Sequence, residues 1–276
     1  DRNLSRGLGD VYKRQGFDAG HGLPFDSDGM KERYPGIFFS QFSGAEMMAE
    51  KWNLSREDLD KFALSSHQKA AAAVEGKYFD REILPIHAKN ADGKSDMVFN
   101  DEGIRYDASF EALSGLNPVT EGGLITAGNA SQITDGAAAI LICNDEGLKK
   151  VKSDPRAKIT GISVVGDDPI MMLGGPIPAS HKVLRATNLN IKDIDLYEVN
   201  EAFAPVPLSW AIELKADMAK LNVNGGAMAL GHPLGATGAK LMTTLLHELE
   251  RTNGKYGLQA ICEGGGTANA TIIERI

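Results

Sequence analysis

Short apolar runs alternate with helix-length stretches through the second half of the chain. The apolar runs have the length of buried strands, and glycine, proline and asparagine cluster between them and the longer stretches. This alternation predicts an α/β layered sheet whose strands are covered by helices. The predicted strands are 157–165, 196–199, 259–262 and 267–273, and the predicted helices are 179–187, 202–214 and 235–250.

The first half of the chain has a weaker pattern. Residues 16–44 show no sustained hydrophobic period and predict an irregular loop region. A helix is predicted at 45–52, and a second at 56–75, where Ser55 followed by Asp58 is typical of a capping box. The other elements predicted before residue 123 are a strand at 83–87, a turn at 90–93 and a short helix at 109–116.

Residues 124–143 (LITAGNASQITDGAAAILIC) pass from small polar residues into an alanine-rich run that ends in Ile140-Leu141-Ile142-Cys143. This order predicts a tight turn and a short helix, followed by a buried strand. Cys143 is interpreted as a small buried hydrophobic residue of that strand. A linking helix is expected at 145–152.

The charge of the chain argues against a purely electrostatic binder. Its 29 Lys and Arg residues and 37 Asp and Glu residues give a formal net charge of −8. No run approaches the roughly 18 apolar residues that a membrane-spanning helix requires. We therefore expect neither nucleic-acid nor membrane partners.

Two cysteines, Cys143 and Cys262, are too few for a disulfide framework, and neither belongs to a CxxC pair or to a histidine cluster with metal-ligand spacing. The sequence therefore predicts no metal site and favours a reducing, cytoplasmic compartment. Residues 1–15 begin with Asp and have neither a regular period nor the apolar centre of a secretory signal. This leader is either non-native sequence, such as a translated linker, or a frayed terminus, and we expect the chain to be a fragment.

A glycine-rich segment at 224–238 (NGGAMALGHPLGATG) places His232 between Gly231 and Pro233. Glycine permits tight turns and proline is favoured where a helix begins, so the pattern predicts a rigid loop that presents the imidazole. The glycines of GHPLGATG also loosely imitate a dinucleotide-binding fingerprint. Their spacing differs from that of G-x-G-x-x-G, and no acidic residue closes a following strand.

Cys262 ends an apolar strand and is followed, after Glu263, by three glycines. Glycines let backbone N–H groups converge on a substrate oxygen, as an oxyanion hole requires. Cys262 is therefore a candidate nucleophile, or a candidate general acid and base that acts with His232. Isolated cysteines are often core residues, but the glycine triplet favours a functional role.

Asn200 opens the segment NEAFA (200–204) directly after the predicted strand 196–199. Two roles are open for it. Asparagine is a favoured N-cap, so Asn200 can cap the helix predicted at 202–214. It can also hold a water molecule or polarise a substrate carbonyl beside His232.

In this order, NEAFA at 200–204, NGGAMALGHPLGATG at 224–238 and CEGGG at 262–266 resemble the thiolase family, which includes acetyl-CoA acetyltransferases and 3-ketoacyl-CoA thiolases. The resemblance also covers residues 174–179, TAGNAS at 126–131 and the helix predicted at 45–52. It therefore extends over almost everything after residue 16.

The resemblance implies a fold of two similar α/β/α layered halves with an inserted loop domain, in an enzyme that forms homodimers or homotetramers. Residues 16–123 would form the loop domain, 124–152 the last helix and strand of the first half, and 153–276 the complete second half. The rest of the first half would be missing, including the nucleophilic cysteine. Neither Cys143 nor Cys262 occupies that cysteine's place.

The resemblance also implies roles for single residues. Cys262 is similar to the base that takes a proton from the acetyl methyl carbon or from the CoA thiol. His232 is similar to the histidine that activates the nucleophile and helps to bind the thioester oxygen. Asn200 resembles the residue that positions a water molecule in one oxyanion hole, and the N–H group of Gly264 resembles a donor in the other.

Coenzyme A and acyl-CoA are the expected ligands. The matching positions are Ala130 and Ser131 near the pantetheine, Arg105 near the nucleotide, and Met172 and Phe203 in the pocket wall. Core packing is the alternative for Met172 and Phe203. Ser40-Gln41 stands where short-chain biosynthetic members carry a His-Met pair, which leaves room for longer or bulkier 3-ketoacyl groups.

The activity implied for the parent protein is CoA-dependent cleavage of a 3-ketoacyl-CoA to acetyl-CoA and a shortened acyl-CoA, or the reverse Claisen condensation. Without its nucleophile, this chain alone is expected to be inactive. The alternatives are a non-catalytic acyl-CoA-binding protein of the same fold and a decarboxylating ketoacyl synthase. The motifs around Asn200, His232 and Cys262 favour a thiolase over both.

Overall fold

The computed structural model describes residues 19–276 except 21, 23, 24, 26 and 90–92. The leader at 1–15 and most of the turn expected at 90–93 therefore lie outside the described residues. Within the described ranges, no helix combines the length and the apolar character needed to cross a membrane.

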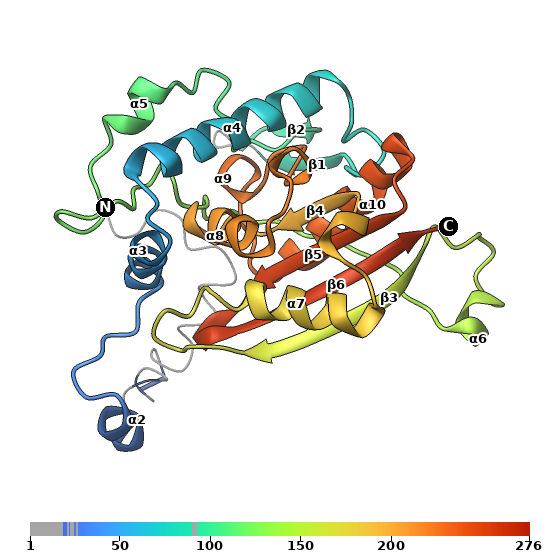
Figure 1. The fold of residues 1–276 in the computed structure, drawn as a ribbon. Helices are drawn as coiled ribbons and strands as arrows, with labels where there is room; N and C mark the ends of the chain where they lie inside the picture. Colours follow the sequence, from blue (N-terminus) through green and yellow to red (C-terminus); the bar gives the residue numbers. More distant parts are fainter. Residues whose placement is uncertain (1–18, 21, 23–24, 26, 90–92) are drawn as a thin grey trace.

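A four-stranded mixed sheet forms in the second half of the chain (Figure 1). Its order is β3-β6-β5-β4, where β3 is Ala157–Gly166, β4 is Leu196–Val199, β5 is Tyr256–Cys262 and β6 is Thr267–Arg275. β6 pairs antiparallel with β3 and β5, whereas β4 and β5 are parallel. All four predicted strands are confirmed, and the carboxyl ends of β4 and β5 meet at one edge of the sheet.

Helices cover both faces of this sheet (Figure 1). α7 (Pro176–Thr187) packs on one face, where Ser163 Oγ of β3 donates a hydrogen bond of 2.7 Å to a backbone carbonyl of α7. α10 (Thr237–Thr252) packs on the other face, where Gln259 Nε2 of β5 donates a hydrogen bond of 2.7 Å to the first turn of α10. The second half thus has the expected α/β/α layers.

α8 (Pro205–Leu214) lies beside α7 on the same face of the sheet. It packs on α7 and carries the fully buried Trp210, whose Nε1 donates to Ser180 Oγ of α7 at 2.8 Å. The ring of Trp210 also contacts Tyr197 of β4, with ring centroids 5.3 Å apart. α3 (Gln41–Lys51) packs on α8 and so joins the first half of the chain to the same core.

α4 (Arg56–Glu75) begins at the predicted capping box. Asp58 N donates to Ser55 Oγ at 3.1 Å, and Ser55 N donates to Asp58 Oδ2 at 2.8 Å. The remaining α-helices and strands in the described ranges are α2 (Asp28–Arg33), the hairpin of β1 (Ile86–Lys89) and β2 (Ser95–Val98), α5 (Phe110–Ser114), α6 (Asp145–Leu148) and α9 (Ala227–Leu230). The sequence pattern predicted neither α2 nor α9.

The short helix and buried strand expected within residues 124–143 are wrong. This segment contains neither element, and Ile140, Leu141 and Ile142 are 40%, 75% and 68% exposed. A strand requires a neighbouring strand for its hydrogen bonds, and no described strand pairs with this run. Cys143, expected to be buried, is exposed for the same reason.

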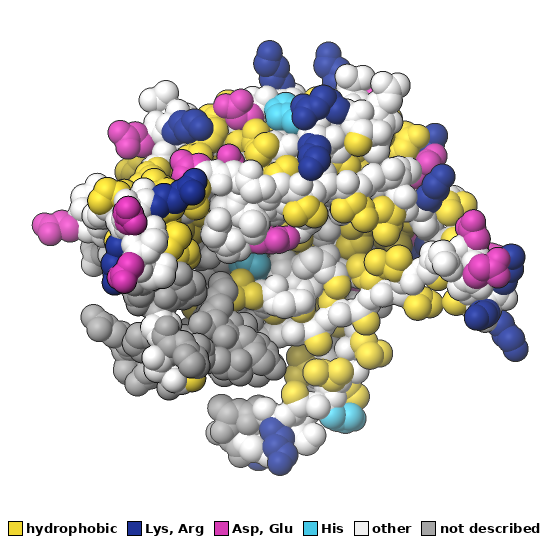
Figure 2. Space-filling view, turned by 90° about the horizontal axis from the view of Figure 1, so that it is seen from below, with side chains coloured by type: hydrophobic (Ala, Val, Ile, Leu, Met, Phe, Trp, Pro, Cys, Tyr) yellow, Lys and Arg dark blue, Asp and Glu magenta, His cyan; other side chains and the backbone are white. Residues whose placement is uncertain are grey.

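Apolar side chains are also exposed on β3, at one edge of the sheet. Ile162 and Val164 are 61% and 60% exposed, and they point away from α7 because Ser163 between them points toward it. Seen from below, hydrophobic side chains gather between the projecting α6 segment and the rest of the molecule (Figure 2). Such a gathering is typical of a surface that another protein segment covers.

Candidate active site

Asn200 and Cys262 lie at the edge of the sheet where the parallel strands β4 and β5 end. Asn200 follows β4 directly, and its N–H group donates to Ala260 O of β5 at 3.0 Å. Cys262 is the last residue of β5 and is buried. The alternative role of Asn200 as a helix N-cap is wrong, because α8 begins only at Pro205, with Ala204 as its N-cap.

His232 is held by the backbone and by Thr237. Its N–H group donates to Gln132 O at 3.0 Å, directly after Gly231, which adopts a φ of +82°. Its Nδ1 lies 2.6 Å from Thr237 Oγ1, and that hydroxyl donates to Pro233 O at 3.0 Å. Gly231 and Pro233, which flank His232, therefore hold the imidazole on a fixed loop, as predicted.

These contacts assign the protons of the imidazole. The hydroxyl proton of Thr237 is used on Pro233 O, so Thr237 Oγ1 accepts a hydrogen bond from Nδ1–H of His232. The lone pair of a neutral His232 then lies on Nε2, which is 3.2 Å from Asn200 Nδ2 and accepts from it. His232 thus presents its basic nitrogen to Asn200.

The other polar atom of the Asn200 amide, Oδ1, is buried and unpaired in the described part of the chain. Asn200 is 1% exposed, and its Oδ1 has no hydrogen-bond partner among the residues that the structure describes. An unpaired buried amide oxygen costs about 1–3 kcal/mol. This orphaned atom fits a position where a water molecule or a polar substrate group binds.

The glycine triplet after Glu263 forms a tight turn, η3 (Gly264–Gly266). Gly265 and Gly266 have φ values of +71° and +83°, which favour glycine. Gly264 faces open space, so a ligand can approach its backbone. The Glu263 carboxylate accepts a hydrogen bond from Asn269 Nδ2 at 2.5 Å and is thereby directed toward β6.

The positions expected to contact CoA at the pantetheine lie together. Ala130 forms a β-bridge with Phe203, and Ser131 N donates to Ala202 O at 2.9 Å. The loop that carries Ala130 and Ser131 therefore runs beside the NEAFA segment. The ring of Phe203 also packs edge-on against Phe42 of α3, with ring centroids 5.3 Å apart.

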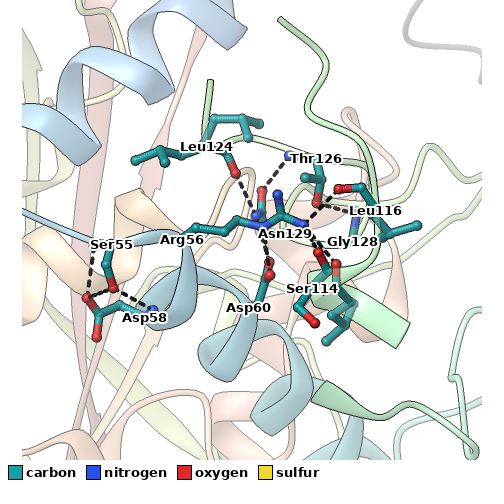
Figure 3. A network of polar contacts seen from close by, with 12 residues as sticks. Ser55, Arg56, Asp58, Asp60, Ser114, Leu116, Leu124, Thr126, Gly128 and Asn129 are labelled. Carbon is teal, nitrogen blue, oxygen red and sulfur yellow. Dashed lines mark hydrogen bonds and ion pairs between the residues drawn. The ribbon is translucent and has the colours of Figure 1, made fainter. Parts of the chain in front are cut away.

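A buried polar network holds this loop in place (Figure 3). Asn129, which precedes Ala130, donates from Nδ2 to Asp60 Oδ1 of α4 at 3.0 Å. Asp60 also forms an ion pair of 2.6 Å with Arg56, and Arg56 donates to the carbonyl oxygens of residues 113, 114 and 116. α4 thereby anchors the loop that carries Ala130 and Ser131, and the segment after α5.

The other two positions expected near CoA are Arg105 and Met172. Arg105 lines a shallow pocket of about 250 Å³ against α4, and its backbone N–H donates to His67 Nδ1 at 3.1 Å. Burial and the charge of Arg105 lower the pKa of His67, which is buried. Met172 is buried and packs against Gly44 of α3, in line with the core-packing alternative.

Sequence reasoning missed Gln132, which joins several parts of the site. Its Nε2 donates to Gly103 O at 2.7 Å and to Met228 O at 2.8 Å, while its backbone carbonyl accepts from His232. It also missed Thr237, whose hydroxyl sets the proton position on the imidazole. The only signals in the sequence are their places, directly after Ser131 and within the GHPLGATG run.

A second buried polar group lies against α10. Glu82 Oε1 accepts a hydrogen bond from Thr244 Oγ1 at 2.9 Å, and Glu82 Oε2 lies 3.5 Å from His247 Nδ1. Burial raises the pKa of Glu82 to about 7. Glu198 and Glu201 are buried as well, and burial raises the pKa of both carboxyls.

Replacement of Glu82 by glutamine is expected to weaken the pH dependence of stability. Folded chains keep the proton on Glu82 up to a pH of about 7, whereas unfolded chains release it near its ordinary value of 4.5. The free energy of unfolding therefore falls by about 3 kcal/mol as the pH rises through this interval. In Glu82→Gln this contribution is expected to disappear, whereas the contributions of the other buried carboxyls remain.

Urea unfolding at pH 5 and pH 8 measures the effect. Glu121→Gln, in an exposed loop, is the matched control and should keep the wild-type difference between the two pH values. Equal differences in Glu82→Gln and the wild type would contradict the burial of this carboxyl.

The geometry is that of a candidate acid–base site in an α/β protein. An amide and an imidazole are in contact, a buried thiol lies at the same strand edge, and a glycine turn follows the thiol. In the described ranges, no group of three His, Cys, Asp or Glu side chains is arranged to hold a metal ion.

Comparison with known proteins identifies the family. The model of the thiolase N-terminal domain matches residues 27–146, and that of the thiolase C-terminal domain matches residues 153–275. The chain belongs to the thiolase family of acyltransferases.

Three similar proteins illustrate the match. The steroid 3-ketoacyl-CoA thiolase FadA6 of Mycobacterium tuberculosis is 53% identical over 88% of this chain and 58% of its own length. The crystal structure of the Bacillus anthracis acetyl-CoA acetyltransferase is 40% identical, with a TM-score of 0.83 over 88% of this chain and 61% of that one. Human mitochondrial 3-ketoacyl-CoA thiolase in complex with CoA is 43% identical, with a TM-score of 0.78 over 85% of this chain and 58% of that one. The present chain thus spans about three fifths of these relatives.

Proposed function

We propose that this chain carries the acid–base half of a thiolase active site. In the parent protein, that site would catalyse the CoA-dependent cleavage of a 3-ketoacyl-CoA to acetyl-CoA and a shortened acyl-CoA, or the reverse condensation. The observation that carries the proposal is the contact between Asn200 and His232 at the strand edge where the buried Cys262 ends β5.

Each residue has a chemical task in this proposal. Cys262 acts as the base that removes a proton from the acetyl methyl group, and His232 activates the nucleophile through its basic Nε2. Asn200 holds a water molecule that donates to one carbonyl oxygen, and the N–H group of Gly264 donates to the other. A Claisen condensation builds negative charge on two carbonyl oxygens in turn, so each oxygen needs its own donors.

The ligand is coenzyme A, as substrate and as the carrier of the acyl group. Ala130, Ser131 and Phe203, which the structure brings together, would contact the pantetheine, and Arg105 would contact the nucleotide. The acyl group would be longer or bulkier than acetoacetyl. Ser40-Gln41 supports this, as does the similarity to a relative named as a steroid 3-ketoacyl-CoA thiolase.

The domain organisation is part of the proposal. Residues 16–123 would form the loop domain and 153–276 the second half of a homodimeric or homotetrameric enzyme. The matched ranges of the two family models, 27–146 and 153–275, support a boundary near residue 150. This chain alone would not catalyse thiolysis, because the exposed Cys143 and the strand-end Cys262 leave no cysteine for the nucleophile's place.

Two measurements on the purified chain test the proposal. Isothermal titration with CoA is expected to show saturable binding that weakens in Arg105→Ala. A thiolysis assay with a medium-chain 3-ketoacyl-CoA and CoA is expected to show no acetyl-CoA. Failure to bind CoA would contradict the site, and thiolysis that depends on a cysteine would contradict the proposed inactivity.

A further inference from the structure

Glu201 directly follows Asn200, yet its side chain turns into the interior and is 1% exposed. Its carboxylate accepts three hydrogen bonds. Ser66 Oγ donates to Oε2 at 2.7 Å, Met228 N donates to Oε2 at 3.2 Å, and Asn222 Nδ2 donates to Oε1 at 2.9 Å. These donors belong to α4, to α9 and to the loop before α9, so one side chain joins three segments to the end of β4.

The carboxylate is the form that satisfies these donors. Gly226 N donates to Ser66 Oγ at 3.0 Å, so the hydroxyl of Ser66 has its proton available for Glu201. Burial raises the pKa of Glu201, whereas the hydrogen bonds from Ser66, Asn222 and Met228 and the charge of Lys69 lower it. A charged acceptor surrounded by donors holds them more strongly than a neutral one does.

The glycine turn is shaped around this carboxylate. A Cβ atom at Gly226 would overlap the carboxyl carbon and oxygens of Glu201. Asn222 is fixed to β4 as well, because its Oδ1 accepts from Val199 N at 2.9 Å and its Nδ2 donates to Val199 O at 2.9 Å. The loop that leads to His232 is therefore held by hydrogen bonds to Val199, the last residue of β4, and to Glu201.

We infer that Glu201 is a positioning residue for the Asn200–His232 pair. Asn200 precedes it in the chain, and α9, which it holds through Met228, ends directly before Gly231 and His232. The carboxylate thereby fixes the two partners of the 3.2 Å contact relative to each other. This role rests on the proposed function, in which Asn200 and His232 act together.

Glu201→Gln tests the inference without a change of size. An amide has one acceptor oxygen and turns its NH2 group toward a donor, so at least one of the three hydrogen bonds is lost. In the ¹⁵N-histidine-labelled chain, the ring nitrogen signals of His232 are expected to shift, whereas those of the exposed His181 stay in place. Glu198→Gln is the matched control, because it removes a buried carboxyl of β4, three residues before Glu201, and should leave His232 unchanged.

Kinetic measurements distinguish a positioning role of Glu201 from a general effect on the stability of the fold. In D2O, the exchange of the acetyl protons of acetyl-CoA reports on the proposed base. Glu201→Gln is expected to lower kcat for this exchange about tenfold, as the loss of a hydrogen bond to a charged group would, with little change in KM. In the Asn200→Ala background the same substitution should have no further effect, whereas a purely structural role would lower the rate by the same factor in both backgrounds.

Ser66→Ala provides a second variant if Glu201→Gln does not fold. It removes one donor and keeps the carboxylate, so it should shift the same His232 signals by a smaller amount. Unchanged His232 signals in a folded Glu201→Gln, or in Ser66→Ala if only that variant folds, would overturn the inference. Absence of exchange in the wild-type chain would instead contradict the proposed function, and the histidine signals would still decide the role of Glu201.

Discussion

Cys262→Ala is expected to slow the exchange of acetyl-CoA methyl protons with D2O by about 10²- to 10⁴-fold, the range over which a general base contributes. The exchange needs only the base and the hydrogen-bond donors to the thioester oxygen. It does not need the nucleophilic cysteine, which we propose is absent from this chain. Cys262 is buried at the end of β5 and is followed by the glycine turn that offers those donors. Loss of the methyl signal in proton NMR spectra measures the rate.

Cys143→Ala is the matched control, because Cys143 is exposed in the segment before α6. With Cys143→Ala, the methyl protons of acetyl-CoA should exchange at the wild-type rate. Both variants should still bind CoA. Equal exchange rates in Cys262→Ala and the wild type would show that Cys262 is not the base. Binding of CoA without any exchange in the wild type would favour the non-catalytic acyl-CoA-binding alternative.

Gly225→Ala is expected to lower the free energy of unfolding by about 2–5 kcal/mol. Gly225 has a φ of +78°, which costs an alanine about 1–2 kcal/mol. A Cβ atom would also lie 2.6 Å from Ser66 O and 2.8 Å from Ala70 Cβ of α4, and such overpacking typically costs about 1–3 kcal/mol. Urea unfolding followed by circular dichroism measures the loss.

Gly122→Ala separates the two contributions. Gly122 has a similar φ of +74°, but a Cβ atom there would meet no heavy atom within 4 Å. The free energy of unfolding of Gly122→Ala should therefore fall by only about 1–2 kcal/mol, the cost of the backbone conformation alone. Equal losses in the two variants would mean that the glycine loop does not lie against α4 as closely as the structure indicates.

Local signals in the sequence predicted most of the fold of the second half. The apolar run 196–199 became β4, and the Ser55–Asp58 capping box marks the start of α4. The run 140–143 has the same apolar character as a strand but has no pairing partner among the described strands, and it is exposed. Hydrophobicity identifies a candidate strand, whereas strand formation depends on a neighbour that the local pattern does not contain.

The candidate site was predictable to the extent that glycine and proline marked it. They pointed to His232 and Cys262, and the contact between Asn200 and His232 agrees with the functional alternative for Asn200. Glu201 was overlooked because its partner Ser66 lies 135 residues away in the sequence. Gln132 was also overlooked, because the carbonyl groups that its side chain contacts, those of Gly103 and Met228, lie far from it in the sequence. The chemical roles of Cys262, His232, Asn200 and Gly264 remain predictions.

Gln132 has a consequence for the motions of the molecule. Its side chain holds the backbone at Gly103 and Met228, and its own backbone holds His232. The segment that leads to Arg105 and the loop that carries the imidazole therefore share one set of hydrogen bonds. Local opening of either segment breaks hydrogen bonds that hold the other in place, so the two segments should open as one cooperative unit in amide hydrogen exchange. A ligand that orders the Arg105 segment would then also slow the opening of the histidine loop.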